Sequence, residues 1–427
     1  MGLDLKWTRR SFMSIVGAVT GALLSPRGTL SLPSTTKNDG VKITGFGSTG
    51  NVYDELGVAT VINGQGTMTV LGGSLMRPEV EAVMALATQH FVSIPDLEVA
   101  AGRRISEMLK LPAGYSAIVT SGAAAAMQSG LAGILTGNNP KFIEQIPDLT
   151  GMKSEVIIQK SHRNPFDHQL RTTGVKLVVI ETREELRKAV NDRTAMMHFS
   201  NFANAEGQIK VDEWVKLGKE LNIPTFIDAA ADTPPVSHLW DYATMGYDLI
   251  AYSGGKAMRG PQCAGLLIGR QELVANALLN NSPHEDTIGR SQKVGKEEIV
   301  GMVKALELYL ADDHEAQNKE WQSRLELIAR KMSGLPGVTT SYFVPDIANH
   351  VPHMEVRWDL GKIKISAEDA VKTLRGGKPS IVLAEAEKHA FGEKRDDSLT
   401  ICSFMLKPGE DAIIASKLYE LLKAHSA

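Results

Sequence analysis

The 427-residue sequence has little cysteine, no long hydrophobic run and no strong excess of either charge. Its two cysteines, Cys263 and Cys402, exclude a disulfide framework. The two cysteines could form one disulfide in an oxidising compartment. The commoner role of isolated cysteines is that of buried apolar residues. No apolar run reaches the roughly 20 residues of a membrane-spanning helix, so the body of the chain is expected to be soluble. The net charge of −3 gives no general attraction for nucleic acid.

Residues 1–30 differ in composition from the rest of the chain. Arg9 and Arg10 precede an uncharged run of small and apolar residues, 14–25, that ends before Pro26. This order resembles a twin-arginine export signal and predicts a periplasmic or otherwise exported protein, whether the signal is cleaved or kept as an anchor. If the segment is instead an ordinary N-terminal helix, a cytoplasmic protein is expected. Residues 31–50, rich in Ser, Thr, Gly, Asn and Lys, are interpreted as a linker.

Short runs of β-forming residues alternate with helices or turns from residue 116 onward. There are seven such runs: Ser116–Thr120, Glu155–Gln159, Lys176–Ile180, Ala195–Phe199, Pro224–Asp228, Leu249–Tyr252 and Ala264–Ile268. They predict an α/β fold with a mostly parallel seven-stranded sheet that is covered on both faces. Residues 51–300 are assigned to this large domain, including an N-terminal arm whose apolar periodicity predicts helices over 79–88 and 97–111.

Residues 301–427 are predicted to form a smaller α+β C-terminal domain. One or two long helices over 296–335 lead into it. The remaining pattern predicts strands near 339–343, 353–358 and 399–402, a helix near 367–374 and a closing helix over 411–424.

Lys256 lies between two apolar strands in the glycine-rich run 252–262, where the backbone is expected to approach another group closely. A free lysine has a pKa of about 10.4. A lysine that attacks a carbonyl must be neutral, which a confined, desolvated site favours. The alternative is a lysine in a surface hairpin. No cluster of metal ligands is expected.

Asp228 ends the apolar run 224–227, which places its carboxylate at the edge of the sheet where parallel α/β folds bind ligands. A carboxylate there can keep a pyridine nitrogen protonated. A helix N-cap is the alternative role.

The segment Ser121, Gly122 and Ala123 follows a strand and opens an alanine-rich helix. Unpaired N–H groups and the positive end of the helix dipole make such a turn an anion site, although an ordinary N-cap has the same pattern. An anion site, an acid and a lysine follow one another along the chain. This order predicts a cofactor site in which Lys256 is the catalytic residue.

The string SGGKAMRGPQCAGLLIG resembles the lysine segment of class V-type aminotransferase-fold enzymes that use pyridoxal 5′-phosphate (PLP). This resemblance implies PLP fold type I, a Schiff base of the cofactor with Lys256 and a phosphate contact from Ser253. It also implies that Asn204 bonds the phenolic oxygen of the cofactor and that His162 stacks on its ring. The alanines at 229–231 stand where the family often has a glutamine, which argues against sulfur transfer of the cysteine desulfurase kind.

The stretches GVATVINGQGTMTVLGGSLMRPEV and IGRSQKVGKEEIVGMVKALE resemble the selenocysteine synthase-like group, which includes seryl-tRNA selenium transferase and glucosaminate-6-phosphate ammonia-lyase. In that group Asn63 and Thr67 would lie near the cofactor as substrate contacts. Arg290 would reach the site of a second subunit, because enzymes of this fold type form homodimers or larger homo-oligomers. Arg357 is a candidate for binding a substrate carboxylate, with a solvated strand arginine as the alternative.

The resemblance implies α-proton abstraction from a small amino acid or amino-sugar acid, with Lys256 as the base. A lyase that eliminates ammonia or a β-substituent is preferred. A selenocysteine synthase-like transferase, a racemase and an aminotransferase are the alternatives, and an inactive PLP-fold binding protein is the non-enzymatic one. The motifs begin near Gly57, which leaves no room ahead of them for a tRNA-binding domain, and no nucleic-acid partner is expected.

Overall fold

The computed structural model describes residues 45–48, 50–346, 348–387 and 394–426. Contacts divide the chain into two units, residues 1–59 and 60–427. The first unit contains the short helix α1 (Val52–Glu55), and the predicted export signal and most of the predicted linker lie outside the described residues. Within the described residues, no helix has the length and apolar content needed to span a membrane. All elements below belong to the second unit.

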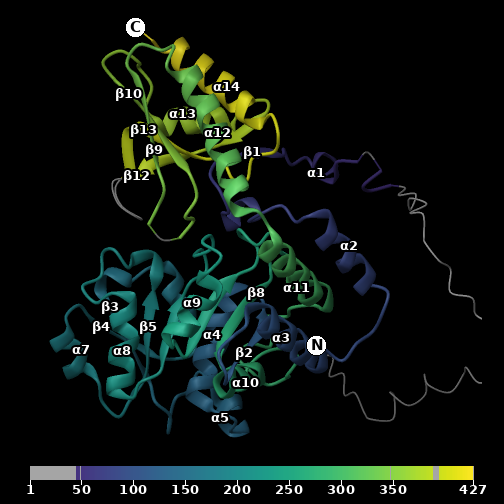
Figure 1. The fold of residues 1–427 in the computed structure, drawn as a ribbon, viewed down its shortest axis with the longest axis vertical. Helices are drawn as coiled ribbons and strands as arrows, with labels where there is room; N and C mark the ends of the chain where they lie inside the picture. Colours follow the sequence, from purple (N-terminus) through teal and green to yellow (C-terminus); the bar gives the residue numbers. More distant parts are fainter. Residues whose placement is uncertain (1–44, 49, 347, 388–393, 427) are drawn as a thin grey trace, which may run out of the picture. The chain divides into compact units, whose positions relative to one another are not determined.

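A seven-stranded sheet forms the centre of the larger part of this unit (Figure 1). Its strands are β2 (Tyr115–Thr120), β3 (Glu155–Gln159), β4 (Lys176–Ile180), β5 (Thr194–Ser200), β6 (Thr225–Asp228), β7 (Leu249–Ser253) and β8 (Gly265–Arg270). They lie in the order β2-β8-β7-β6-β5-β3-β4. Strand β8 is antiparallel to both of its neighbours, and the other neighbouring strands are parallel. The predicted mostly parallel sheet is confirmed.

Helices bury both faces of this sheet. Successive residues of a strand point to opposite faces, and accordingly Val119 and Ile118 pack into two different hydrophobic cores. Helices α3 (Ile94–Leu109), α8 (Val211–Leu221), α9 (His238–Met245) and α11 (Lys296–Ala311) contribute to the first core. Helices α4 (Gly122–Thr136) and α10 (Gln271–Leu279) contribute to the second. The larger part also contains α2 (Pro78–Ala87), α5 (Pro140–Gln145), α6 (His168–Arg171) and α7 (Arg183–Ala189).

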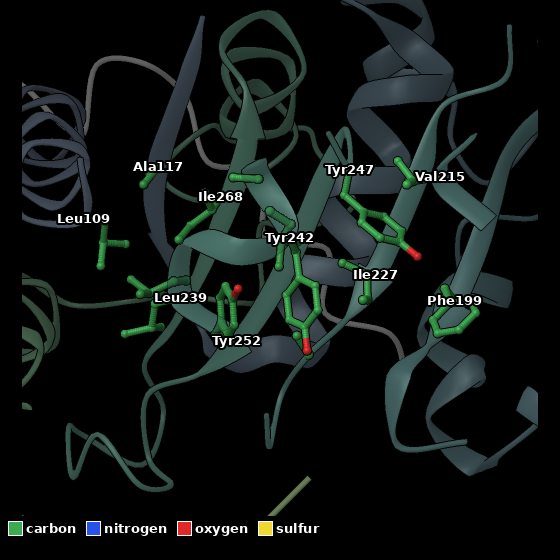
Figure 2. Packing of buried hydrophobic residues seen from close by; sticks show 14 of the residues in the cluster. Leu109, Ala117, Phe199, Val215, Ile227, Leu239, Tyr242, Tyr247, Tyr252 and Ile268 are labelled. Carbon is green, nitrogen blue, oxygen red and sulfur yellow. The ribbon is translucent and has the colours of Figure 1, made fainter. Parts of the chain in front are cut away.

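Four buried tyrosines belong to the first core, and Figure 2 shows three of them, Tyr242, Tyr247 and Tyr252. Each of these three hydroxyls has a hydrogen-bond partner: Tyr247 donates to the carbonyl of Val211 at 2.8 Å and Tyr252 to the carbonyl of His238 at 2.6 Å. Tyr242 instead donates to a carboxylate of the candidate site, described below. A buried hydroxyl without a partner would cost free energy, so these hydrogen bonds allow aromatic rings to fill the space beneath the sheet.

A smaller antiparallel sheet, in the order β12-β13-β10-β9, forms a second part of the unit. Its strands are β9 (Val338–Phe343), β10 (His353–Trp358), β12 (Ala384–Glu387) and β13 (Lys394–Cys402), and it packs with α12 (His314–Met332), α13 (Ala367–Arg375) and α14 (Glu410–Ala424). This confirms the predicted smaller α+β part. Cys402 is buried and Cys263 exposed, and both are free thiols.

One pairing was not predicted from the sequence. Strand β1 (Val61–Asn63) of the N-terminal arm pairs in parallel with β11 (Ser380–Val382), and Ile62 belongs to the hydrophobic core of the smaller part. Further along the arm, α3 contributes to the core of the large sheet. The arm therefore packs with the smaller part at its start and with the larger part at its end.

Helix α3 covers the open edge of β2, which is the outermost strand of the large sheet. A Cβ atom on Gly102 would lie 2.0 Å from the carbonyl oxygen of Ala117, so only a glycine permits this close approach. The backbone N–H of Val119 donates to Oε2 of Glu98 at 3.0 Å. A buried carboxyl thus satisfies an edge amide, and burial raises the pKa of Glu98 to about 8.

The raised pKa of Glu98 predicts a pH-dependent stability. Because the native state binds this proton more tightly than the unfolded chain does, the stabilisation is complete below a pH of about 4.5 and is lost as the pH rises toward 8. Between pH 5 and pH 8 we expect the wild type to lose about 3 kcal/mol more unfolding free energy than Glu98→Gln, which stays neutral. Urea unfolding at the two pH values measures this difference, and parallel pH profiles for the two proteins would contradict it.

Candidate active site

The polar residues that follow β2, β6 and β7 meet at one cavity. Its volume is about 270 Å³, and its lining includes Ser121, Asp228, Ser253 and Lys256. Strands β2, β6 and β7 run in the same direction, so their carboxyl ends reach the same edge of the sheet. That edge is where open α/β sheets bind ligands.

Lys256 lies in a tight turn directly after β7. The N–H of Arg259 donates to the Lys256 carbonyl at 2.9 Å, and the N–H of Gly260 donates to the Gly254 carbonyl at 2.9 Å. A Cβ atom on Gly254 would lie 2.2 Å from the sulfur of Met302, so the glycine next to the turn is required by close packing, as the sequence predicted. Burial lowers the pKa of Lys256, although nearby carboxylates partly offset this effect. The site therefore favours a neutral amine more than water does.

Asp228 is the last residue of β6 and is 7% exposed. The N–H of Ala230 donates to its Oδ1 at 3.0 Å. Burial raises the pKa of Asp228, while this hydrogen bond and the charge of Lys256 lower it. A positive charge brought into the cavity would therefore stabilise the carboxylate form.

A second carboxyl, Asp232, also lines the cavity and was not predicted from the sequence. Nδ2 of Asn201 and the hydroxyl of Tyr242 donate to its Oδ2 at 2.6 and 2.8 Å. Burial raises the pKa of Asp232 to about 6, the hydrogen bonds from Asn201 and Tyr242 lower it, and the charge of Asp228 raises it again. Its position four residues after Asp228 was visible in the sequence, but the loop conformation that turns it inward was not.

The turn that begins α4 provides a site for an anion. Gly122 has φ +81°, and a Cβ atom built on it meets nothing within 4 Å, so open space lies above the turn. The Ser121 side chain makes no capping hydrogen bond, which leaves its hydroxyl available. Oγ1 of Thr67, also in the lining, is buried without a hydrogen-bond partner. Together with the first N–H groups of a 15-residue helix, these groups fit a phosphate.

His162 does not line the cavity. It is fully buried, its ring lies 4.3 Å from that of Phe199 in an edge-on arrangement, and its Nδ1 accepts from the N–H of Ser200 at 3.2 Å. A buried imidazole needs such partners, and they hold the ring within the protein. Two other aromatic rings line the cavity, those of Phe166 and Phe202.

Asn204 and Asn63 also lie outside the lining, and their side-chain amides form hydrogen bonds with the backbone. Oδ1 of Asn204 accepts from the N–H of Val211 at 2.9 Å at the start of α8. Oδ1 of Asn63 accepts from the N–H groups of Gln65 and Gly66 at 3.0 and 3.1 Å. Of the two predicted substrate contacts in this arm, the structure brings only Thr67 to the cavity.

Arg357 lies on the outer face of β10 and is absent from the cavity lining. Met354, Val356 and Trp358 point into the core, so alternation turns Arg357 outward, where it pairs with Glu355 at 2.6 Å. Within the single chain Arg357 is thus a half-buried, ion-paired strand arginine, and a substrate contact of this residue stays a prediction. Arg290 is half-buried after α10 and does not line the cavity within the single chain.

Comparison with known proteins identifies relatives along nearly the whole chain. D-glucosaminate-6-phosphate ammonia lyase of Salmonella typhimurium is 29% identical over 390 residues, which cover 89% of this chain and 100% of that protein. 5′-C-glycyluridine monooxygenase-decarboxylase of a Streptomyces species is 28% identical, with 87% of this chain and 92% of that protein covered. L-seryl-tRNA(Sec) selenium transferase of Mannheimia succiniciproducens is 28% identical but covers 59% of this chain and 57% of that protein.

A solved structure of D-glucosaminate-6-phosphate ammonia-lyase superposes with a TM-score of 0.74 and 26% identity, covering 88% of this chain and 99% of that one. The aminotransferase class-V family matches residues 103–342, more than half of the chain. This match contains the turn that begins α4, both carboxyls and the lysine turn. The chain therefore belongs to the aminotransferase class-V family.

Proposed function

We propose that the protein is a PLP-dependent lyase that eliminates ammonia from an amino-sugar acid. The observation that carries this proposal is the convergence of Lys256, Asp228 and the open turn at Gly122 on one cavity. The likeness to an enzyme named D-glucosaminate-6-phosphate ammonia lyase, along 89% of the chain, supports the substrate class and the reaction.

The residues present fit the cofactor. The turn from Ser121 to Ala123, together with Ser253, would bind its phosphate, Asp228 would hold a proton on its ring nitrogen, and Lys256 would bind it covalently. When bound, PLP supplies an electron sink that stabilises negative charge at the α-carbon of the substrate.

The side chains around the cavity would move the protons of the reaction. Nζ of Lys256 would remove the α-proton, since burial lowers its pKa and so increases the share of neutral amine. Asp232 would donate a proton to the β-hydroxyl of the sugar acid, which leaves as water, and hydrolysis of the resulting imine would then release ammonia. Burial raises the pKa of Asp232 to about 6, although the hydrogen bonds from Asn201 and Tyr242 lower it. Asn201 and Tyr242 would hold that carboxyl in place.

Cofactor binding at Lys256 can be tested by spectroscopy. Protein incubated with PLP should show a visible absorption band that borohydride fixes to the chain, and Lys256→Ala should abolish both. Lys216→Ala is a matched control, because Lys216 is exposed on α8 and pairs with Asp212. An undiminished, borohydride-fixed band in Lys256→Ala would contradict the proposal. A wild type without any band would favour an inactive binding protein.

The reaction can be tested with amino-sugar acids in deuterated water. Exchange of the α-hydrogen together with ammonia release is expected. Exchange without release would indicate a racemase, and conversion of the cofactor to its aminated form an aminotransferase. We expect Asp232→Asn to keep the exchange but to slow ammonia release about 100-fold, as for loss of a general acid. Equal slowing of both steps would contradict the assignment of Asp232 as proton donor.

We also propose that the protein is a homodimer, with apolar residues of the N-terminal arm buried between subunits. Within the single chain, residues 70–99 expose Val70, Leu86, Phe91, Val92 and Val99 to solvent. Exposed apolar residues in such number are typical of a protein–protein interface. Thr67 and Gly73 of the same arm line the cavity, so a second subunit there would lie close to the active site.

Light scattering should give twice the mass of the chain for the wild type. The double variant Leu86→Asp/Phe91→Asp should shift the equilibrium toward monomer, because two buried carboxylates would cost about 2 to 4 kcal/mol of association free energy. Ile413→Asp is a control at an exposed apolar residue of α14. A monomeric wild type, or a double variant that stays as dimeric as the control, would contradict the dimer proposal.

A further inference from the structure

A second cavity of about 310 Å³ shares two stretches of chain with the first. Ala257 and Arg259 of the lysine turn line it, as do Leu75 and Arg77 of the arm. The same two stretches contribute Lys256 and Gly73, respectively, to the first cavity. Whatever occupies the second cavity therefore touches the segments that form the active site.

Basic side chains dominate the charged lining of this cavity. Arg77, Arg259, Arg324 and Lys407 line it, whereas Glu320 is the one acidic residue among the described lining residues. Such an excess of positive charge around an enclosed space attracts anions.

Two of these cations are neutralised by neighbouring carboxylates. Arg77 forms an ion pair with Asp312, and Arg324 with Glu320. Arg324 also donates to the carbonyl of Ser403 at 3.3 Å. These contacts hold the two guanidinium groups in fixed positions in the wall of the cavity.

Arg259 and Lys407 form no ion pair with a described residue. The guanidinium of Arg259 donates through Nε to the carbonyl of Leu75 at 2.7 Å, and no described residue accepts from its Nη groups. Burial and the charge of Arg77 lower the pKa of Arg259, and the charges of Asp312 and Glu79 offset part of this effect. A bound anion would add negative charge next to the Nη groups of Arg259.

The backbone at Arg259 has an uncommon conformation. Its φ is +55°, a left-handed conformation that favours glycine or asparagine and is uncommon for a long side chain. Strain of this kind is often found at ligand sites, where other contacts offset it.

We propose that this cavity binds a phosphoryl group. A phosphoryl group presents several oxygens to donors from different directions, and the Nη groups of Arg259 and the amine of Lys407 come from separate segments. The cavity is larger than an inorganic phosphate, which leaves space for the small molecule that carries the group. The source is either a free phosphate compound or the far end of a phosphorylated substrate, and only the second source rests on the proposed function.

Trp321 provides a local signal, because its ring lines this cavity next to that of Phe404. Inorganic phosphate, titrated at constant ionic strength with chloride as the reference anion, should give a saturable change in tryptophan fluorescence. Protein treated with PLP and borohydride keeps the first cavity filled during the titration. Trp321→Phe should remove the signal while phosphate still raises the melting temperature.

Arg259→Gln and Lys407→Gln should each weaken phosphate binding at least tenfold. Arg187→Gln should bind as the wild type does, because Arg187 pairs with Glu220 away from the cavity. Lys407→Gln decides the matter if Arg259→Gln fails to fold. Absence of a saturable change, or unchanged affinity in the variants, would overturn the proposal. Arg259→Gln and Lys407→Gln show whether phosphate binds in the second cavity even if the protein takes up no PLP. The phosphoryl site and the proposed lyase function can therefore be contradicted independently of each other.

Competition distinguishes the two sources. If a phosphorylated amino-sugar acid displaces inorganic phosphate and its unphosphorylated form does not, the site binds the far end of the substrate. If phosphate binds equally well with that compound present, the site binds a separate anion. Both results support a phosphoryl site.

Discussion

The burial of both faces of the seven-stranded sheet is the constraint on which the arrangement of the active site depends. Because helices cover both faces, the strand interiors accept apolar side chains, and the polar side chains gather where the strands end. The parallel strands β5, β6 and β7 and the more distant β2 all end at the same edge. Residues far apart in the sequence, Ser121, Asp228 and Lys256, meet there as a consequence of the topology.

Charge balance in the cavity follows from the same burial. Two carboxyls, Asp228 and Asp232, accompany a single amine, Lys256. Desolvation acts against the charged form of all three groups, and the carboxyls also repel each other. A protonated pyridine nitrogen near Asp228 would supply the missing positive charge. The lining is therefore better suited to a cation held at Asp228 than to an apolar ligand.

The strands of the large sheet could be predicted because each is a continuous apolar run bounded by turns. Strands β1 and β11 could not, since each has three residues and their pairing joins distant parts of the chain. The outward position of Arg357 was readable in the alternation of the run 353–358, but the prediction considered the type of residue rather than the face of the strand.

The asparagines show a different limit of sequence reasoning. Asn201 begins the short 3-10 helix that follows β5, and Asn204 is the residue directly after it. The sequence does not specify which of them turns inward, because that depends on contacts with Asp232 and Tyr242 from another segment. Similarly, His162 was placed at the ring by resemblance alone, whereas within the single chain it is buried in contact with Ser200 and Phe199 and is not among the lining residues.

The lysine turn packs against the N-terminal arm, which also lines the second cavity. A Cβ atom on Gly73 would lie 1.8 Å from Oε1 of Gln262, so the arm packs tightly against the end of this turn. Two residues after Gly73 in the arm, the carbonyl of Leu75 accepts a hydrogen bond from the guanidinium of Arg259. The same arm, residues 67–77, lines both cavities and carries the exposed Val70. A displacement of this arm by a ligand in the second cavity, or by a neighbouring subunit, would therefore move the backbone that positions Lys256.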